Sequence, residues 1–343
     1  MEPILNTLFV TTEGAYLRKE HERVVIELPD AEDVKLPLRH LGSLVLFGRA
    51  MLTPALLRWC GENGLTVTWL TRHGRFCGRL VGPQSGNVLL RLEQHRAAAD
   101  SGLALSIARN IVAGKVQNTR NSILRSRRDC DDEQDRSHLQ AAADHLAACL
   151  RALPGKTALD EVRGIEGEAA RTYFGVLDTM IRPHAEKLSF CGRVRRPPTD
   201  PVNSLLSFLY AILVHDCAAA AEGVGLDPQV GFLHAPRPGR PALALDLMEE
   251  LRPVLADRLT LTLLNRRQLK PEDFERRQGG AVHIADDARR TVLKAFQQRK
   301  QDEITHPVLD RPMPLGLVPH VQARLLARTL RGDLDAYPPF IYG

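Results

Sequence analysis

The spacing of apolar residues changes abruptly near residue 85 of this 343-residue chain. Before that point, apolar and β-branched residues fall in short runs bounded by glycine or proline, at residues 7–11, 24–28, 43–47 and 66–70. One helix interrupts them, because Thr53 can cap its N-terminus, Pro54 fits its first turn and Gly61 follows its apolar face. The first 85 residues therefore predict a β-rich domain.

From residue 86 onward the apolar residues recur at helical spacing over long segments. Ile107, Ile111 and Val112 share one helical face, and a similar stripe runs from Leu139 to Leu146. We therefore predict an α+β protein: a small β-sheet or β-sandwich domain over residues 1–85, a hinge at 81–86, and a larger all-α catalytic domain over 86–343. The last residues, 338–343, are expected to form a loose tail.

Several protein classes are excluded by composition. No run of about 18 uncharged apolar residues is present, which argues against a transmembrane helix. The first five residues lack the basic start and long apolar core of a secretory signal. Six scattered cysteines with no C-x-x-C pair argue against a disulfide framework or a cysteine-rich zinc module. A reduced, cytoplasmic protein is expected.

The formal net charge is only +5, but the basic residues are clustered. Residues 115–128 hold five basic side chains and residues 187–196 hold four, with no acid in either stretch. Arginine is well suited to binding phosphate. The clusters favour a polyanionic partner, with solvated helix faces as the alternative. The candidate DNA-binding residues are Arg120, Arg127, Arg128, Arg193, Arg195 and Arg196.

A carboxylate stands on the apolar side of one predicted helix. At 3.6 residues per turn, Glu166 falls on the stripe of Ala170, Tyr173 and Leu177. A core-facing carboxylate is costly unless it is paired, hydrogen-bonded or bound to a metal. Glu166 is therefore a candidate functional residue, and the alternative is that it only neutralises a helix N-terminus after Gly164.

A second group of polar residues follows about 70 positions later. His234 precedes a loop rich in proline, glycine and arginine, and a helix expected to begin near Leu245 carries Asp246 and Glu249 three residues apart on one face. Glu166, His234 and Glu249 together supply two carboxylates and an imidazole. This set suits Mg²⁺ or Mn²⁺, and the imidazole favours Mn²⁺. Taken alone, the second group favours the alternative of a solvent-facing acidic pair and an ordinary histidine, and it becomes a candidate site only together with Glu166.

Two polar residues are expected to support that site. Asn203 and Tyr210 lie seven positions apart and so share a face of the helix that opens at Pro201. Hydrogen bonds from this face to the ligands or to DNA would explain polar groups among leucines. Simple capping of the helix by Asn203 is the alternative.

These residues lie in segments that resemble a known family, the CRISPR-associated integrase/endonuclease, the first-numbered Cas protein. The resemblance covers nearly the whole chain. The matching segments are residues 163–174, 197–210, 224–234 and 246–250, with residues 6–12 and 85–91 similar to the type I-C branch. Some members have aspartate where Glu249 stands. The resemblance therefore leaves open whether Glu249 or Asp246 is the innermost third ligand.

The resemblance implies a fold, an activity and partners. Members have an N-terminal β domain that forms homodimers and a helical domain with a divalent-metal site. They bind the small second-numbered Cas protein and join the 3′-hydroxyls of prespacer DNA to the CRISPR repeat by transesterification. It implies catalytic roles for Glu166, His234, Glu249 and Asp246, and makes double-stranded DNA the partner. The alternatives are a metal-dependent phosphohydrolase acting on nucleotides and a non-catalytic DNA-binding subunit.

Overall fold

The computed structural model describes residues 6–29, 31–80, 82, 88–182, 188, 190–194 and 197–343. The chain divides into two compact units. The N-terminal unit joins residues 1–85 to 284–302, and the helical unit joins residues 86–283 to 303–343. We expected residues 284–302 to belong to the helical domain, but the structure places them in the N-terminal unit. At the start of that segment, Asp286 accepts a hydrogen bond of 3.2 Å from Arg72 Nε in the N-terminal unit.

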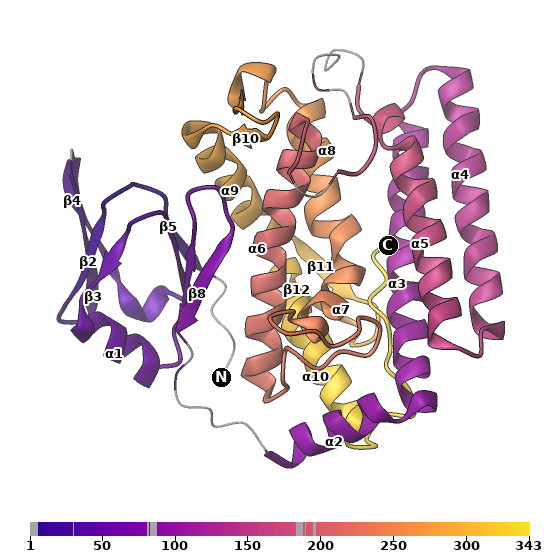
Figure 1. The fold of residues 1–343 in the computed structure, drawn as a ribbon, viewed down its shortest axis with the longest axis horizontal. Coiled ribbons are helices and arrows are strands. Elements are labelled where there is room, and N and C mark those ends of the chain that lie inside the picture. The colour runs from indigo at the N-terminus through magenta and orange to yellow at the C-terminus, as the bar shows by residue number, and fades with distance from the viewer. Residues whose placement is uncertain are drawn as a thin grey trace. The chain divides into compact units, whose positions relative to one another are not determined.

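The N-terminal unit is built on two four-stranded sheets (Figure 1). The strands are β1 (Thr7–Val10), β2 (Tyr16–Glu20), β3 (Arg23–Leu28), β4 (Ala31–Pro37), β5 (Ser43–Phe47), β6 (Met51–Leu52), β7 (Thr66–Leu70) and β8 (Phe76–Leu80). One sheet has the order β1-β5-β7-β8 and the other β4-β3-β2-β6. The four predicted runs are confirmed as β1, β3, β5 and β7. β4 was not predicted, because its residues are mostly exposed and carry no apolar run.

The predicted interrupting helix is also confirmed. Helix α1 (Pro54–Glu62) begins after Thr53, whose hydroxyl accepts the backbone N–H of Leu56. Its buried side chains, Leu56 and Cys60, join strand residues from both sheets in one apolar cluster. The helix and the two sheets therefore share a core.

The helical unit accounts for most of the chain. Its helices are α2 (Val88–Ala99), α3 (Ser101–Arg128), α4 (Glu133–Ala152), α5 (Leu159–Val176), α6 (Pro201–Val224), α7 (Ala242–Leu251), α8 (Arg258–Asn265) and α10 (Val318–Leu330), while α9 (Asp286–Gln301) belongs to the N-terminal unit. Two short ribbons pair β9 (Phe274–Arg276) with β10 (Val282–Ile284) and β11 (Glu303–His306) with β12 (Arg311–Pro314). The α+β class is confirmed, and the second domain is mostly helical as expected. It is not all-α, because it contains these ribbons, whose strands of three or four residues are too short to leave a periodic signal.

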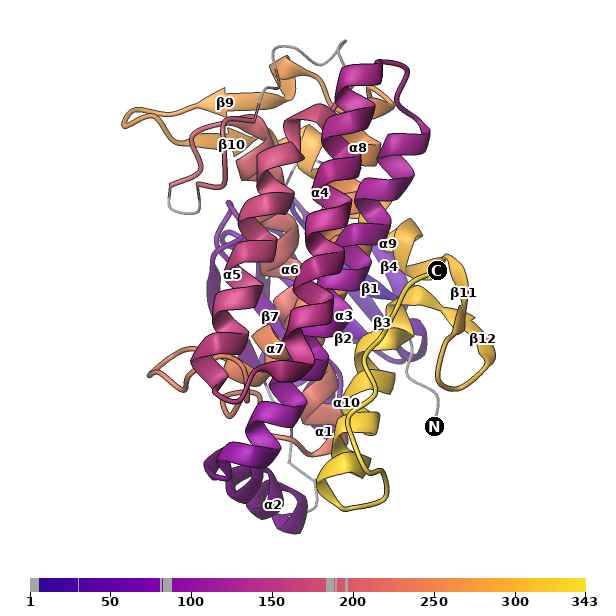
Figure 2. The ribbon, with the colours of Figure 1, turned by 90° about the vertical axis from the view of Figure 1, so that its right-hand side faces the viewer.

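Helix α3 is the axis of the helical unit. It packs against α4, α5 and α7, and α6 packs against α7 and α10 (Figure 2). By length and composition alone α6 could cross a membrane, but 67% of its apolar window is buried within the protein. It is therefore a core helix.

The C-terminal segment is not a loose tail, and that expectation is wrong. It runs along α3 (Figures 1 and 2), and three asparagines of α3 hold it. Asn110 and Asn121 donate to the carbonyl groups of Tyr337 and Tyr342 at 2.9 and 2.7 Å. Asn118 donates to the Phe340 carbonyl at 2.9 Å, and the Phe340 side chain is fully buried. An irregular segment leaves no pattern in the sequence because its backbone partners are side chains distant along the chain.

A buried carboxylate fixes the same segment to α7. Glu250 Oε2 accepts the backbone N–H of Phe340 at 2.8 Å and Nε2 of Gln322 at 3.0 Å. Burial raises the pKa of Glu250 to about 8, although these donors lower it. The packing is close: a Cβ on Gly114 of α3 would lie 3.0 Å from Pro339 and 3.1 Å from the Glu250 side chain.

We predict that Glu250→Gln removes a pH dependence from the stability of the protein. Folded wild type keeps the Glu250 proton up to about pH 8, whereas an ordinary carboxyl releases it near 4.5. Wild-type stability therefore falls as pH rises between these values, by about 1.4 kcal/mol for each unit of pKa difference. The amide has no proton to lose in this range. The free energy of unfolding of the variant, relative to that of wild type, therefore rises as the pH rises across this window. Urea unfolding in metal-free buffer at pH 5 and pH 8.5 measures it, and a constant difference between the two proteins would contradict it.

Candidate active site

Two carboxylates from different helices meet at one lysine. Lys115 of α3 forms ion pairs with Glu166 of α5 and, at 2.6 Å from its Nζ to Oε2, with Glu249 of α7. The side chains of Lys115 and Glu249 are 9% and 3% exposed, whereas that of Glu166 is 28% exposed. The group is therefore anchored in the interior and open to solvent on the Glu166 side.

His234 lies beside these carboxylates and is held in one orientation. Its Nδ1 is 2.7 Å from Asp246 Oδ1, and its Nε2 is 3.8 Å from Glu249 Oε1. Asp246 is fully buried and also accepts the backbone N–H groups of Phe232, Leu233 and His234 at 2.6–3.0 Å. Because Asp246 accepts the hydrogen bond from Nδ1–H, Nε2 is the ring nitrogen that faces Glu249.

The segment before His234 is fixed by close packing on α7. A Cβ on Gly231 would lie 2.7 Å from the carbonyl carbon of Ala242 and 2.7 Å from Asp246 Oδ2, so only glycine fits. Arg163 of α5 donates from Nε to the Leu233 carbonyl at 2.8 Å. These contacts fix the backbone at residues 231 and 233, directly before His234, and so set the position of the imidazole.

Positive charge surrounds Glu249. Burial alone would raise its pKa, but the charges of Arg252, Lys115 and His234 outweigh burial and hold the pKa well below its usual value. Arg252 Nη1 lies 2.8 Å from Glu249 Oε1 and 3.1 Å from Oε2. Glu249 is therefore ionised at neutral pH and able to hold a cation.

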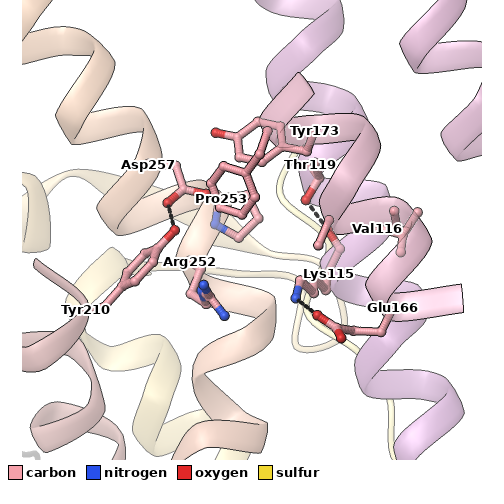
Figure 3. Close-up of a pocket in the computed structure, with 12 residues that line it drawn as sticks. Lys115, Val116, Thr119, Glu166, Tyr173, Tyr210, Arg252, Pro253 and Asp257 are labelled. Atoms are coloured by element: carbon pink, nitrogen blue, oxygen red, sulfur yellow. Dashed lines mark hydrogen bonds and ion pairs between the residues drawn. The ribbon is translucent and has the colours of Figure 1, made fainter. Parts of the chain in front are cut away.

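The helix changes pitch directly after Glu249. Residues Arg252–Asp257 form a π-helical turn, a feature common at functional sites. This turn faces a pocket lined by side chains of α3, α5 and α6 (Figure 3). Tyr210 of α6 donates to Asp257 in the pocket wall, and burial raises the pKa of Asp257 to about 6. The Arg252 guanidinium lies 4.1 Å from the centre of the Tyr210 ring.

The structure thus brings together the predicted Glu166, His234 and Glu249. Asp246 also lies here, but its contacts differ from theirs. The oxygens of Asp246 accept three backbone N–H groups and contact Nδ1 of His234. They are occupied by the loop, whereas Glu249 faces Lys115 and Nε2 of His234.

Asn203 and Tyr210 act at different distances from the site. Asp200, not Asn203, caps α6, since Asp200 Oδ1 accepts the Asn203 N–H at 2.8 Å. The Asn203 side chain accepts from Arg193 Nη1 at 2.7 Å and from the backbone of Val194 at 3.0 Å. Asn203 therefore holds the 192–194 segment. The Tyr210 ring packs against Arg252, which in turn contacts Glu249.

The predicted DNA-binding arginines differ in what their side chains contact. Arg193 donates to Asn203 and to Ser207 and lies 5.4 Å from the Tyr210 ring, so its guanidinium is engaged within the protein. Arg120 Nε donates to the Ala143 carbonyl of α4. Arg127 and Arg128 end α3, and Arg128 is exposed. Arg195 and Arg196 lie outside the described residues.

Sequence reasoning missed Lys115, Arg252 and Arg163 as parts of this site. Lys115 was grouped with the basic stretch, yet it lies three and four positions after Val112 and Ile111, which are both fully buried. A lysine on an apolar stripe is the same signal that identified Glu166, and it predicts a buried anionic partner. For Arg252 and Arg163 the partners are set by tertiary contacts, and the sequence has no comparable signal.

Another group of possible metal ligands lies on the opposite face of α5. Among the described residues, His145, Cys149 and Glu168 place one ligand atom each within 4.8 Å of one another. His145 Nε2 is already 2.8 Å from Glu168 Oε1. None of the six cysteines forms a disulfide bond.

Comparisons with known proteins identify the family. A family model described as CRISPR associated protein Cas1 matches residues 8–298. A curated relative from Moorella thermoacetica, named CRISPR-associated endonuclease Cas1 1, is 54% identical over 342 residues and covers 100% of both chains.

Two solved structures share the fold. A Cas6-RT-Cas1–Cas2 complex matches with a TM-score of 0.82 and 24% identity, covering 99% of this chain and 36% of that one. A casposase bound to an integration product matches with a TM-score of 0.82 and 21% identity, covering 96% of this chain and 92% of that one. With a family model spanning most of its length and a full-length relative at 54% identity, the chain belongs to the Cas1 family of CRISPR-associated proteins.

Proposed function

We propose that this chain is a divalent-metal-dependent DNA endonuclease and integrase that inserts spacer DNA into a CRISPR array by transesterification. Family membership supports the activity, since the curated full-length relative is named an endonuclease. The observation that carries the site assignment is the meeting of Glu166 and Glu249 at one cation, with Nε2 of His234 directed toward Glu249.

These residues fit a divalent ion. Glu166, His234 and Glu249 would hold it, because their oxygen and imidazole donors already gather around a positive charge, that of Lys115. Asp246 would act as the positioning residue that keeps the His234 ring turned. Oxygen ligands suit Mg²⁺ or Mn²⁺, and the imidazole favours Mn²⁺.

A bound divalent ion would supply charge stabilisation for the phosphate under attack and for the leaving oxygen. The residues around the ion would hold it and leave it open to the substrate. Glu249 stays ionised because Arg252 and Lys115 oppose the effect of its burial. Glu166 and His234, whose side chains are 28% and 20% exposed, form the side through which a DNA strand would reach the site.

We infer the partners of this chain from its family. We assign the chain a homodimer formed through residues 1–85, the small second-numbered Cas protein as its partner, and double-stranded DNA, both prespacer and CRISPR repeat, as its substrate. One structural neighbour is a complex that contains Cas1 and Cas2, and another is bound to an integration product. A DNA substrate and cysteines that form no disulfide bond are consistent with a location in the cytoplasm.

Replacing Glu166 with glutamine should abolish the reaction. The amide is nearly isosteric but removes the charge that would hold the ion, so Mn²⁺-dependent cleavage and strand transfer should fall by more than about 10²-fold. The measurement is transfer of a fluorescent prespacer into a plasmid that carries a repeat. Glu168→Gln is the matched control, since Glu168 lies two residues further on and contacts His145 instead.

Each alternative function predicts a different result in this assay. Near-normal transfer by Glu166→Gln or by His234→Ala would contradict the assignment of the ligands. Metal-dependent activity on free nucleotides with none on DNA would favour a phosphohydrolase. Salt-sensitive DNA binding without turnover in wild type would favour a non-catalytic subunit.

Asp246→Asn should weaken metal binding without removing a ligand. The amide presents N–H groups where the loop and His234 Nδ1 need an acceptor, so the imidazole loses its orientation. We expect Mn²⁺ affinity to fall by about 10- to 100-fold. Calorimetric titration with Mn²⁺ measures this, and an unchanged affinity would mean that Asp246 only stabilises the loop.

The end of α3 should contact DNA phosphates. Replacing both Arg127 and Arg128 with alanine should make the log–log salt dependence of duplex binding shallower by roughly two units, equally for every sequence. Arg120→Ala is the comparison, because Arg120 is tied to α4 and its loss should reduce stability more than the slope. Binding over a salt series decides this, and an unchanged slope for the double variant would leave these arginines as solubilising residues.

A further inference from the structure

We propose that Lys115 is a built-in counter-cation of the metal site: its ammonium group holds Glu166 and Glu249 in place when no ion is bound and gives way when the ion binds. The proposal rests on the proposed function, since it takes these carboxylates as the metal ligands. It adds a residue outside the three ligands that sets how tightly the ion is held.

The contacts of Lys115 support an exchange with the ion. Its ammonium pairs with both carboxylates at once, and Figure 3 shows it directed toward Glu166. These are the same two side chains that would hold a divalent ion. A carboxylate oxygen cannot serve an ammonium group and a metal ion at full strength together, so the two cations compete for it.

The other cation beside Glu249 is placed differently. Arg252 contacts both Glu249 oxygens from its own helix, three residues on, and its guanidinium is stacked on Tyr210. Within the described part of the chain, no ion pair joins Arg252 to Glu166. Arg252 is therefore the less mobile of the two cations. Lys115, which pairs with both carboxylates and has a flexible four-carbon stem, is the cation that the ion would displace.

The charges explain why such a residue is needed. Two carboxylates from α5 and α7 repel one another, and Glu249 is almost fully buried. Without a cation between them the metal-free site would be destabilised or would spread apart. Lys115 keeps it assembled, at the cost of a weaker apparent affinity for the metal ion.

The test compares Lys115→Met with Lys115→Arg in the full-length protein. Lys115→Met keeps the apolar stem and removes the charge, so Mn²⁺ should bind roughly tenfold tighter or more by calorimetric titration. The metal-free melting temperature should fall, and the rise produced by Mn²⁺ should exceed that of wild type. Lys115→Arg keeps the charge and should show neither the tightening nor the full loss of melting temperature. If Lys115→Met does not fold, Lys115→Gln replaces it.

Lys300→Met is the matched control, because Lys300 is another buried lysine, on α9. It should leave Mn²⁺ affinity unchanged even where it lowers the melting temperature. Equal or weaker Mn²⁺ binding by Lys115→Met would overturn the proposal and leave Lys115 a packing residue. If wild type itself shows no Mn²⁺ binding that Glu166→Gln removes, the proposed function fails together with this inference.

Discussion

The placement of a buried carboxylate, Glu249, beside a partly exposed one, Glu166, is the constraint on which this site depends. Ionised groups with little exposure must be paired, and Glu249 is held by Lys115 and Arg252 together. Those pairs join α3, α5 and α7, because Lys115 also contacts Glu166. The same charges that stabilise the interior therefore gather the donors that a divalent ion requires.

The imidazole is positioned by a second set of contacts, which Asp246 makes with backbone N–H groups and with the ring itself. Asp246 is surrounded by backbone N–H groups of residues 232–234, and it turns His234 toward Glu249. The loop can approach α7 this closely only because residue 231 is glycine. A precise side-chain orientation is thus produced by backbone geometry, which tolerates little change, rather than by the side chain's own preferences.

Adjacent carboxylates on α7 have opposite electrostatic roles. Glu249 faces cations and its pKa is lowered, while Glu250 faces neutral donors and burial raises its pKa to about 8. Glu250 binds the C-terminal segment, which also lies against Asn118 and Gly114 of α3. The segment therefore links α7 to α3, the two helices that carry Glu249 and Lys115.

The sequence by itself predicted the two-part organisation, four of the strands and α1, and it selected Glu166, His234, Asp246 and Glu249 as candidate site residues. Periodicity and charge on an apolar stripe are local signals, and the resemblance to family segments predicted that these residues share one site. Only the tertiary structure decided that Asp246 holds the histidine while Glu249 faces the cation, that Lys115 joins the carboxylates, and that the C-terminal segment is buried. Each of these depends on which distant side chain supplies a hydrogen bond or a charge, and spacing along one chain does not encode that choice.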